Sequence, residues 1–191
     1  MKTSAPPRYY VLDASNPNRM LLTNPPHPSL RDRWMAGHRF QKQPAVPVVA
    51  TIKAGNEDGE LLPYFGTANL MSDEFHAALC EAGVDNLEVY EAEIRSENGA
   101  IVHRGYKAFN LIGVVRAADM RKTVFNDPPA SRQIDASIES LEIDPAKVQG
   151  LLMFRLAENV GAVVVHERVK RAIEAKGFPS VVFREPSEFI S

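Results

Sequence analysis

Residues 72–91, SDEFHAALCEAGVDNLEVYE, decide the fold of this chain, because a second segment repeats their pattern at an offset of 94 residues. The second copy is residues 166–185, HERVKRAIEAKGFPSVVFRE. Both copies place apolar residues at i, i+3 and i+4, which is the pattern of a short amphipathic helix. Alternating apolar residues follow each helix after a glycine. The pattern therefore predicts a helix and then a strand in both copies.

The ends of both expected helices carry capping signals. Ser72 is a good N-cap residue, and acidic residues follow it in the first turn, where the helix dipole favours them. Gly83 and Gly177 stand where a left-handed residue ends a helix. Because an apolar segment also precedes each helix, the sequence predicts a strand–helix–strand unit that is used twice. We expect this pseudo-repeat over residues 68–91 and 162–185.

The chain between the two copies has the pattern of β-strands. Leu87 and Val89 alternate, and the alternation resumes one residue out of phase at Ala92 and Ile94, which suggests a β-bulge near Tyr90 and Glu91. Residues 96–99, Ser-Glu-Asn-Gly, predict a hairpin turn. The return strand is expected from Ile101 towards Val115, and further strands at residues 9–12, 137–143 and 151–156. The predicted fold class is α+β, with a mostly antiparallel sheet and two short amphipathic helices.

The chain has 191 residues, which is the size of one ordinary domain, and we expect one domain over residues 1–191. Residues 1–47 are rich in proline, which fixes φ and removes backbone donors. Turns and extended pieces are expected there rather than helices. Trp34 and Phe40 give this segment apolar anchors, so it should wrap onto the core.

The net charge of −2 conceals a strong asymmetry. Residues 1–53, the basic segment, hold eight Lys or Arg against two Asp, a net charge of +6. Residues 57–97, the acidic segment, hold eleven acids against one Arg, a net charge of −10. Such segregation often marks an electrostatic surface for a partner. The alternative is that the two segments neutralise each other in the fold.

Few residues carry a recognisable catalytic or cofactor signature. Cys80 is the single cysteine and should be a half-buried, inert thiol on the first helix. The five histidines show no i, i+4 pairing and no Cys companions, so no zinc site is predicted. Neither a Walker A sequence nor a Gly-x-Gly-x-x-Gly occurs, and no cofactor is expected. The carboxylate pairs Asp73–Glu74 and Glu91–Glu93 have adequate structural roles at a helix start and on a strand.

The partner is not expected to be nucleic acid or a membrane. Arg31-Asp-Arg-Trp34 could contact nucleic acid, but the sequence pI of about 6.2 argues against a nucleic-acid-binding domain. No apolar run reaches the length of a membrane span. The first residues lack the apolar core of a signal peptide, so a cytoplasmic location is predicted.

Several sequence blocks together resemble a bacterial immunity-protein family of polymorphic toxin systems, typified by a myxobacterial member. The likeness covers nearly the whole chain and comes from the set of blocks rather than from any one of them. The blocks are Tyr9-Tyr-Val-Leu-Asp13, Trp34-x-x-Gly37, Ala82-Gly-Val-Asp-Asn86 with the Glu-x-Tyr that follows, Asn110-Leu-Ile-Gly113 with Ala118-Asp119, Leu152-Met-Phe-Arg-Leu156, and Val165-x-Glu-x-Val-Lys170 with Ala175-x-Gly177.

The resemblance implies a protein that holds a cognate toxin inactive in the cell that produces it. It implies no catalytic residues and transfers no toxin contact. If the toxin is a nuclease, its basic cleft would favour an acidic inhibitor surface. The candidate toxin-binding residues are then Asp85, Glu88, Glu91, Glu93 and Glu97. The alternative is a small enzyme whose site is assembled from scattered residues such as His103, Tyr106 and Glu91.

Overall fold

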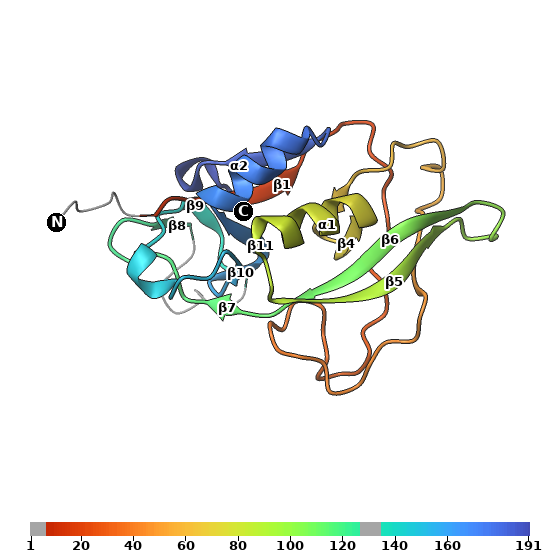
Figure 1. Ribbon diagram of the computed structural model, residues 1–191, viewed down its shortest axis with the longest axis horizontal. Coiled ribbons are helices and arrows are strands. Elements are labelled where there is room, and N and C mark those ends of the chain that lie inside the picture. Colours follow the sequence, from red (N-terminus) through yellow and green to blue (C-terminus); the bar gives the residue numbers. More distant parts are fainter. Residues whose placement is uncertain (1–6, 127–134) are drawn as a thin grey trace.

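The computed structural model describes residues 7–126 and 135–191 of the chain. Within them the fold is α+β, as the sequence predicts, with two helices and mostly antiparallel sheets (Figure 1). The helices are α1 (Asp73–Ala82) and α2 (Glu167–Lys176). The strands are β1 (Tyr9–Ala14), β2 (Val48–Thr51), β3 (Tyr64–Phe65), β4 (Leu70–Ser72), β5 (Leu87–Arg95), β6 (Val102–Leu111), β7 (Val114–Val115), β8 (Val124–Phe125), β9 (Ile138–Ser140), β10 (Met153–Leu156), β11 (Asn159–His166) and β12 (Val181–Arg184).

The start of α1 and the ends of both helices lie where the capping signals predict. The Ser72 hydroxyl accepts a hydrogen bond from the Phe75 N–H at 3.2 Å, which makes Ser72 the N-cap of α1. Gly83 ends α1 at φ 98°, and Gly177 ends α2 at φ 71°. Both glycines are therefore in the left-handed region that the sequence pattern requires.

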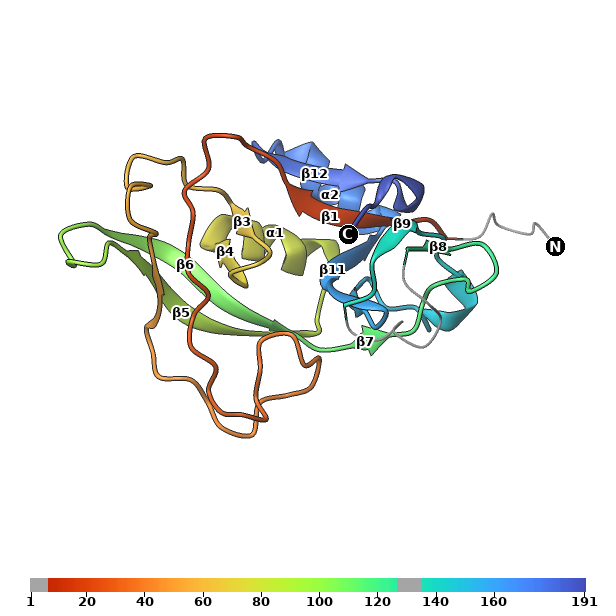
Figure 2. The ribbon, with the colours of Figure 1, turned by 180° about the vertical axis from the view of Figure 1, so that it is seen from behind.

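The two strand–helix–strand units have the same topology. The first sheet has the order β2-β5-β6-β4-β3 and the second has the order β12-β1-β11-β10-β7. In the first, β4 and β5 flank the antiparallel β6; in the second, β11 and β12 flank the antiparallel β1. The central strand of the first unit follows it directly in the chain, whereas the second unit takes its central strand from the N-terminus. Figures 1 and 2 show this as the red β1 beside the blue C-terminal elements.

The helices contact each other and cover one face of both sheets, which creates a shared central core. Phe75 and Leu79 of α1, and Val169 and Ile173 of α2, are at most 1% exposed there. The opposite face of the first sheet carries a second core, and the opposite face of the second sheet carries a third. Each sheet is therefore buried on both faces.

Burial on both faces corrects the interpretation of the phase slip in β5. Leu87 and Val89 pack against the central core, whereas Ala92 and Ile94 pack against the second core on the other face. Side chains therefore alternate regularly along the whole strand. The apolar residues of its first half point to one face and those of its second half to the other, so no bulge lies at Tyr90–Glu91. The irregularity is in the pairing with β6, where Ala92 and Ile94 face residues 106 and 103, so that β6 carries one extra residue. Gly105, at φ 82°, lies in that extra stretch.

Three expected strands are shorter than predicted. The return strand ends at Leu111, and after Gly113 at φ 117° the chain leaves the first sheet. Val114 and Val115 then pair with β10 in the second sheet, so one apolar run serves both sheets. The expected strand 137–143 is reduced to β9, and the strand 151–156 to β10. The Ser96–Gly99 turn is present, with the Gly99 N–H donating to the Ser96 carbonyl at 2.9 Å.

The proline-rich N-terminal segment packs on the second core, where its aromatic anchors are buried. Trp34 is 0% exposed and Phe40 is 6% exposed. Their rings meet edge to face at 5.1 Å, and Tyr90 of β5 completes the cluster. Residues 15–47, which form no helix and no named strand, thus cover the face of the first sheet that lies opposite the helices.

Candidate functional site

Glu88, one of the acidic toxin-binding candidates, forms internal bonds with the N-terminal segment. Its side chain is 15% exposed. It accepts hydrogen bonds from the Phe40 N–H at 3.0 Å and from Asn110 Nδ2 at 2.9 Å, and it pairs with Arg39 at 3.4 Å. Glu88 therefore holds the N-terminal segment on β5 and β6 and has little surface left for a partner.

Glu93 is also engaged within the fold. Its side chain is 12% exposed and pairs with Arg95 and with Arg104, the latter at 2.9 Å. Its hydrogen bond with Arg95 is the main reason that the pKa of the Glu93 carboxyl lies below its usual range. Two of the five candidates are thus structural carboxylates.

The remaining candidates are exposed but separate. Glu91 is 71% exposed and pairs with Lys107, which also lies 3.4 Å from the carboxylate of Asp73. Asp85 follows α1 and Glu97 lies in the β5–β6 turn, and neither has an ion pair among the described residues. The structure therefore does not bring all five candidates together on one acidic surface.

The ion pairs of the described residues show whether the basic and the acidic segment neutralise each other. Arg39–Glu88 is the only ion pair between the basic and the acidic segment in the described part of the chain. The acidic segment is paired mainly with Arg95 of its own strand and with bases of β6 and α2, which are Arg104, Lys107 and Lys176. The basic segment keeps several side chains that have no carboxylate partner in the described residues: Arg19, Arg31, Arg33, Lys42 and Lys53. Mutual neutralisation of the two segments is therefore limited to one pair.

A buried carboxylate that we did not single out from the sequence organises the basic segment. Asp32 is 2% exposed. It accepts hydrogen bonds from the Ser29 hydroxyl at 2.7 Å and from the N–H groups of Gln41 at 3.0 Å and Lys42 at 3.2 Å. These bonds, that from Ser29 first, hold the pKa of Asp32 below its usual range. Its position between Arg31 and Arg33, directly before the buried Trp34, is the sequence signal that could have identified it.

The residues of the alternative enzyme site lie on two faces of one sheet. Tyr106 is buried on the N-terminal-segment side, donates to the Leu62 carbonyl at 3.0 Å, and has its pKa raised to about 12 by burial. Glu91 is on the opposite face, because it precedes Ala92, the residue that faces Tyr106. His103 Nε2 is buried without a hydrogen-bond partner in the described residues. The structure does not place these groups around one substrate position.

Cys80 corrects a second expectation, because its thiol is exposed rather than half-buried. Its Sγ lies 3.5 Å from Nε2 of His76, one helical turn earlier on α1. Burial and the charge of Lys107 lower the pKa of His76. The helix turns the apolar side chains of α1 inward, and position 80 falls just outside that stripe.

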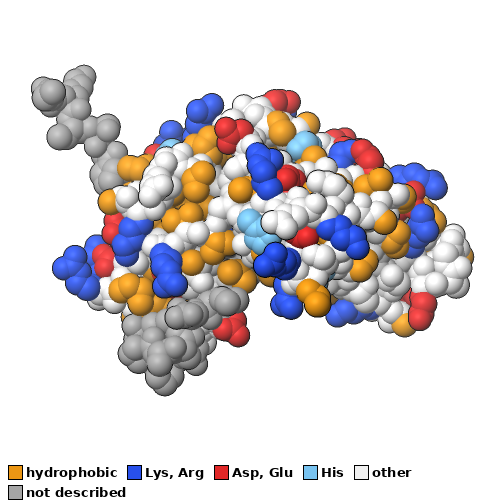
Figure 3. Space-filling model, turned by 90° about the horizontal axis from the view of Figure 1, so that it is seen from below, with side chains coloured by type: hydrophobic (Ala, Val, Ile, Leu, Met, Phe, Trp, Pro, Cys, Tyr) orange, Lys and Arg blue, Asp and Glu red, His pale blue; other side chains and the backbone are white. Residues whose placement is uncertain are grey.

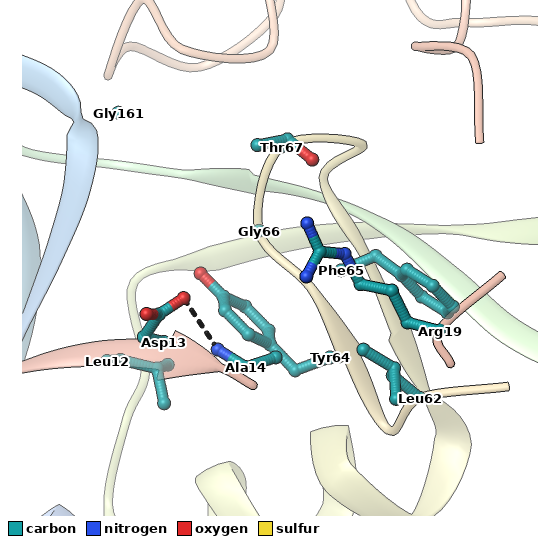
Figure 4. A pocket seen from close by; sticks show the side chains of 10 residues that line it. All are labelled: Leu12, Asp13, Ala14, Arg19, Leu62, Tyr64, Phe65, Gly66, Thr67 and Gly161. Atoms are coloured by element: carbon teal, nitrogen blue, oxygen red, sulfur yellow. Dashed lines mark hydrogen bonds between the residues drawn. The ribbon is translucent and has the colours of Figure 1, made fainter. Parts of the chain in front are cut away.

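A small polar cavity lies at the junction of the two sheets (Figure 4). Its volume is about 150 Å³, below the range of roughly 300–1,000 Å³ typical of small-molecule sites. Tyr64 extends its hydroxyl towards the side where Asp13 lies, and Arg19 reaches in from the other side. Asp13 already accepts from Arg184 at 2.9 Å, and burial raises the pKa of Tyr64 to about 12. At neutral pH Tyr64 is therefore protonated and Asp13 is paired.

The junction also holds a fully buried cation. Arg155 of β10 is 0% exposed and donates to the Val160 carbonyl at 2.9 Å and to Asn69 Oδ1 at 2.5 Å. Burial lowers its pKa, and no carboxylate partner occurs among the described residues. Since Asn69 precedes β4, Arg155 ties the second sheet to the first.

Metal and membrane signals are absent from the part of the chain that the structure describes. No group of three or more His, Cys, Asp or Glu is arranged to hold a metal ion in residues 7–126 and 135–191. In the same residues, neither helix has the length and apolar character that crossing a bilayer requires.

A comparison with protein families gives a match over nearly the whole chain. The family is described as Immunity protein family (Imm11), and the match covers residues 2–188. No curated protein matches the chain in sequence. The resemblance that the sequence blocks indicated is therefore confirmed at the level of the family.

Proposed function

Because the chain belongs to the Imm11 immunity protein family, we propose that it binds a cognate toxin and neutralises it by covering the toxin's active site. The family match over residues 2–188 is the observation that carries this proposal. The proposed place of action is the cytoplasm of the producing cell, where the toxin must be held inactive.

The proposed protection requires no chemical turnover by this chain. One feature supports that part of the proposal. His103, Tyr106 and Glu91 do not surround one position. An occluding protein masks one toxin molecule at a time, so it must be present in at least equal amount.

A nuclease toxin is the partner class that an acidic contact surface would fit, because a nuclease cleft is basic. Of the five candidates, this hypothesis can draw on Asp85, Glu91 and Glu97, whose side chains are exposed. Glu88 and Glu93 would act indirectly, by holding the N-terminal segment and the β5–β6 pair in place. A matched reversal of the three exposed acids to Lys would test the acidic surface without removing these structural bonds.

The proposal is tested by titrating purified protein into a fixed amount of the cognate toxin, which we expect to be encoded by a neighbouring gene. Toxin activity should fall linearly and level off near a one-to-one ratio, and gel filtration should show a stable complex. Full protection at a few per cent of the toxin concentration would show that the chain is an enzyme. Failure of the two proteins to form a complex would overturn the proposed binding function.

A further inference from the structure

The loop 27–40 of the basic segment is held in one conformation by buried anchors. Asp32 fixes its middle through three hydrogen bonds. The Trp34 indole N–H donates to the Pro26 carbonyl at 3.1 Å, and the ring packs edge to face against Phe40 and Tyr90. A loop ordered before binding loses less conformational entropy when a partner docks on it.

This fixed loop directs apolar and basic side chains into solvent. Leu30 is 90% exposed, the highest value among the large hydrophobic residues that the structure describes as exposed. Arg31 and Arg33 flank the Asp32 anchor and are exposed without a carboxylate partner in the described residues. The Arg33 side chain donates a hydrogen bond from Nε to the Leu30 carbonyl at 3.3 Å. Arginine beside apolar surface is a composition enriched in protein interfaces.

An apolar cavity opens beside the loop. Its volume is about 550 Å³, and Trp34, Met35 and Val114 contribute to its wall. His27 and Arg33 lie at the same cavity, where burial and the Arg33 charge lower the pKa of His27. His27 therefore adds no charge to the cavity near pH 7, and the cavity can accept an uncharged side chain.

Neighbouring residues extend this surface. A second cavity, of about 440 Å³, shares His27 and is lined largely by prolines and apolar residues of positions 26–49. Val46, within that stretch, is 61% exposed. Figure 3 views the molecule from the side of the N-terminal segment, and in the middle of this face basic side chains lie beside histidine and hydrophobic side chains.

We infer that the toxin docks on this face, which we call the Arg31 surface and define as Leu30, Arg31, Arg33 and the cavity walled by Trp34, Met35 and Val114. The inference rests on the proposed binding of a cognate toxin, and it places the contact on this face instead of on the exposed acids Asp85, Glu91 and Glu97. The fitting occupant is an acidic protein surface that places carboxylates against the two arginines and one apolar side chain in the cavity. Charge complementarity supports this occupant, because these arginines lack carboxylates of their own within the described chain.

A nucleic acid is the less suitable occupant. A phosphate backbone would match the arginines, but it would leave the exposed Leu30 and the apolar cavity without a counterpart. The chain as a whole carries a net charge of −2, whereas nucleic-acid-binding domains are usually basic.

The test measures binding of the cognate toxin to full-length variants. Arg31→Glu/Arg33→Glu should weaken affinity roughly thirtyfold or more, the scale of hot-spot side chains, and Leu30→Ser should weaken it to a smaller extent. The matched control is Arg121→Glu/Arg168→Glu, which makes the same charge change at two other exposed arginines and should stay within about twofold of wild type. The rival variant Asp85→Lys/Glu91→Lys/Glu97→Lys should also stay near wild type. Melting temperatures verify that each variant folds.

Two results would overturn the inference while leaving the proposed function intact. The first is a complex that tolerates Arg31→Glu/Arg33→Glu and Leu30→Ser but is lost when the three exposed acids are reversed. The second is displacement of the toxin by a DNA or RNA oligonucleotide that binds wild type and not Arg31→Glu/Arg33→Glu. If wild type forms no complex with the toxin, the proposed function fails and the inference fails with it.

Discussion

The acidic segment and the part of the basic segment that follows β1 both pack on the first sheet, yet their charged side chains differ in exposure. Glu88 and Glu93 of β5 are largely covered and paired, and they hold neighbouring elements in place. In the basic segment, the charges that give the segment its sign stay accessible. Arg31 and Arg33 are exposed, whereas the acid between them, Asp32, is buried. Net charge along a sequence therefore does not show which charges remain accessible to a partner.

Trp34→Ala is the variant with the largest expected effect on stability, and it tests whether the basic segment is packed as part of the core. Removing a fully buried tryptophan should lower the free energy of unfolding by about 3–5 kcal/mol, because the N-terminal layer loses its main contact with β5. Urea unfolding followed by far-UV circular dichroism measures the change. A loss below about 1 kcal/mol would mean that the layer is not a packed part of the core.

Asp32→Asn should show how much the buried carboxylate of the loop contributes to the free energy of unfolding. The pKa of Asp32 is lowered in the folded state, so its stabilising contribution is present above the ordinary carboxyl pKa of about 3.9 and is lost as the pH falls through the folded value. The variant should be less stable than wild type at pH 7. Its free energy of unfolding should also fall less steeply when the pH is lowered through the folded-state pKa of Asp32. Trp34 is the single tryptophan, so its fluorescence reports on this loop alone.

The matched variant for the acid titration is Glu93→Gln, because the pKa of Glu93 is also lowered by its bonds. Glu93 lies on the other face of the sheet from Trp34, so this variant should leave the fluorescence titration unchanged. If Glu93→Gln shifted the midpoint of the fluorescence titration as much as Asp32→Asn does, the two carboxylates would not have separate roles.

A comparison of Glu93→Gln with Glu91→Gln tests whether the acidic segment is structural. Glu93→Gln should lower the melting temperature, because two arginines lose their shared partner. Glu91→Gln should change stability by about 0.5 kcal/mol or less, since the side chain is 71% exposed and such pairs contribute little. Differential scanning fluorimetry measures both melting temperatures. Equal decreases for the two variants would show that Glu93 is no more structural than Glu91.

Leu30→Ser should have the smallest effect on stability. A side chain that is 90% exposed has no core contact to lose, so the change should stay within about 0.5 kcal/mol. Thermal melting of the variant beside wild type measures it. A clear destabilisation would mean that Leu30 packs within the fold and is not available to a partner.

Much of the fold could be predicted from the sequence. The positions of α1 and α2, the Ser72 cap and the left-handed glycines depend on neighbours within one helical turn, and all are confirmed. The strand ends were less predictable. The apolar run from Ile101 to Val115 gave no sign that its last two residues would leave for the second sheet.

The five candidate toxin-binding residues differ in exposure, and the sequence did not indicate this difference. The sequence offered five acids as equivalent, and the structure separates them into Glu88 and Glu93, which are paired inside, and Asp85, Glu91 and Glu97, which are exposed. It also offered Arg31-Asp-Arg-Trp34 without showing that its acid and its tryptophan are buried and its arginines exposed.

The sequence by itself determined the paired strand–helix–strand units, because helix periodicity and capping are local and repeat at the same spacing. Only the tertiary structure decided which charges are neutralised and that β5 is buried on both faces. Glu93 meets Arg104 across a strand pair that carries an extra residue, and Asp32 meets Gln41 and Lys42 nine and ten positions away. Such contacts depend on the distance between elements after packing, which neither periodicity nor net charge specifies.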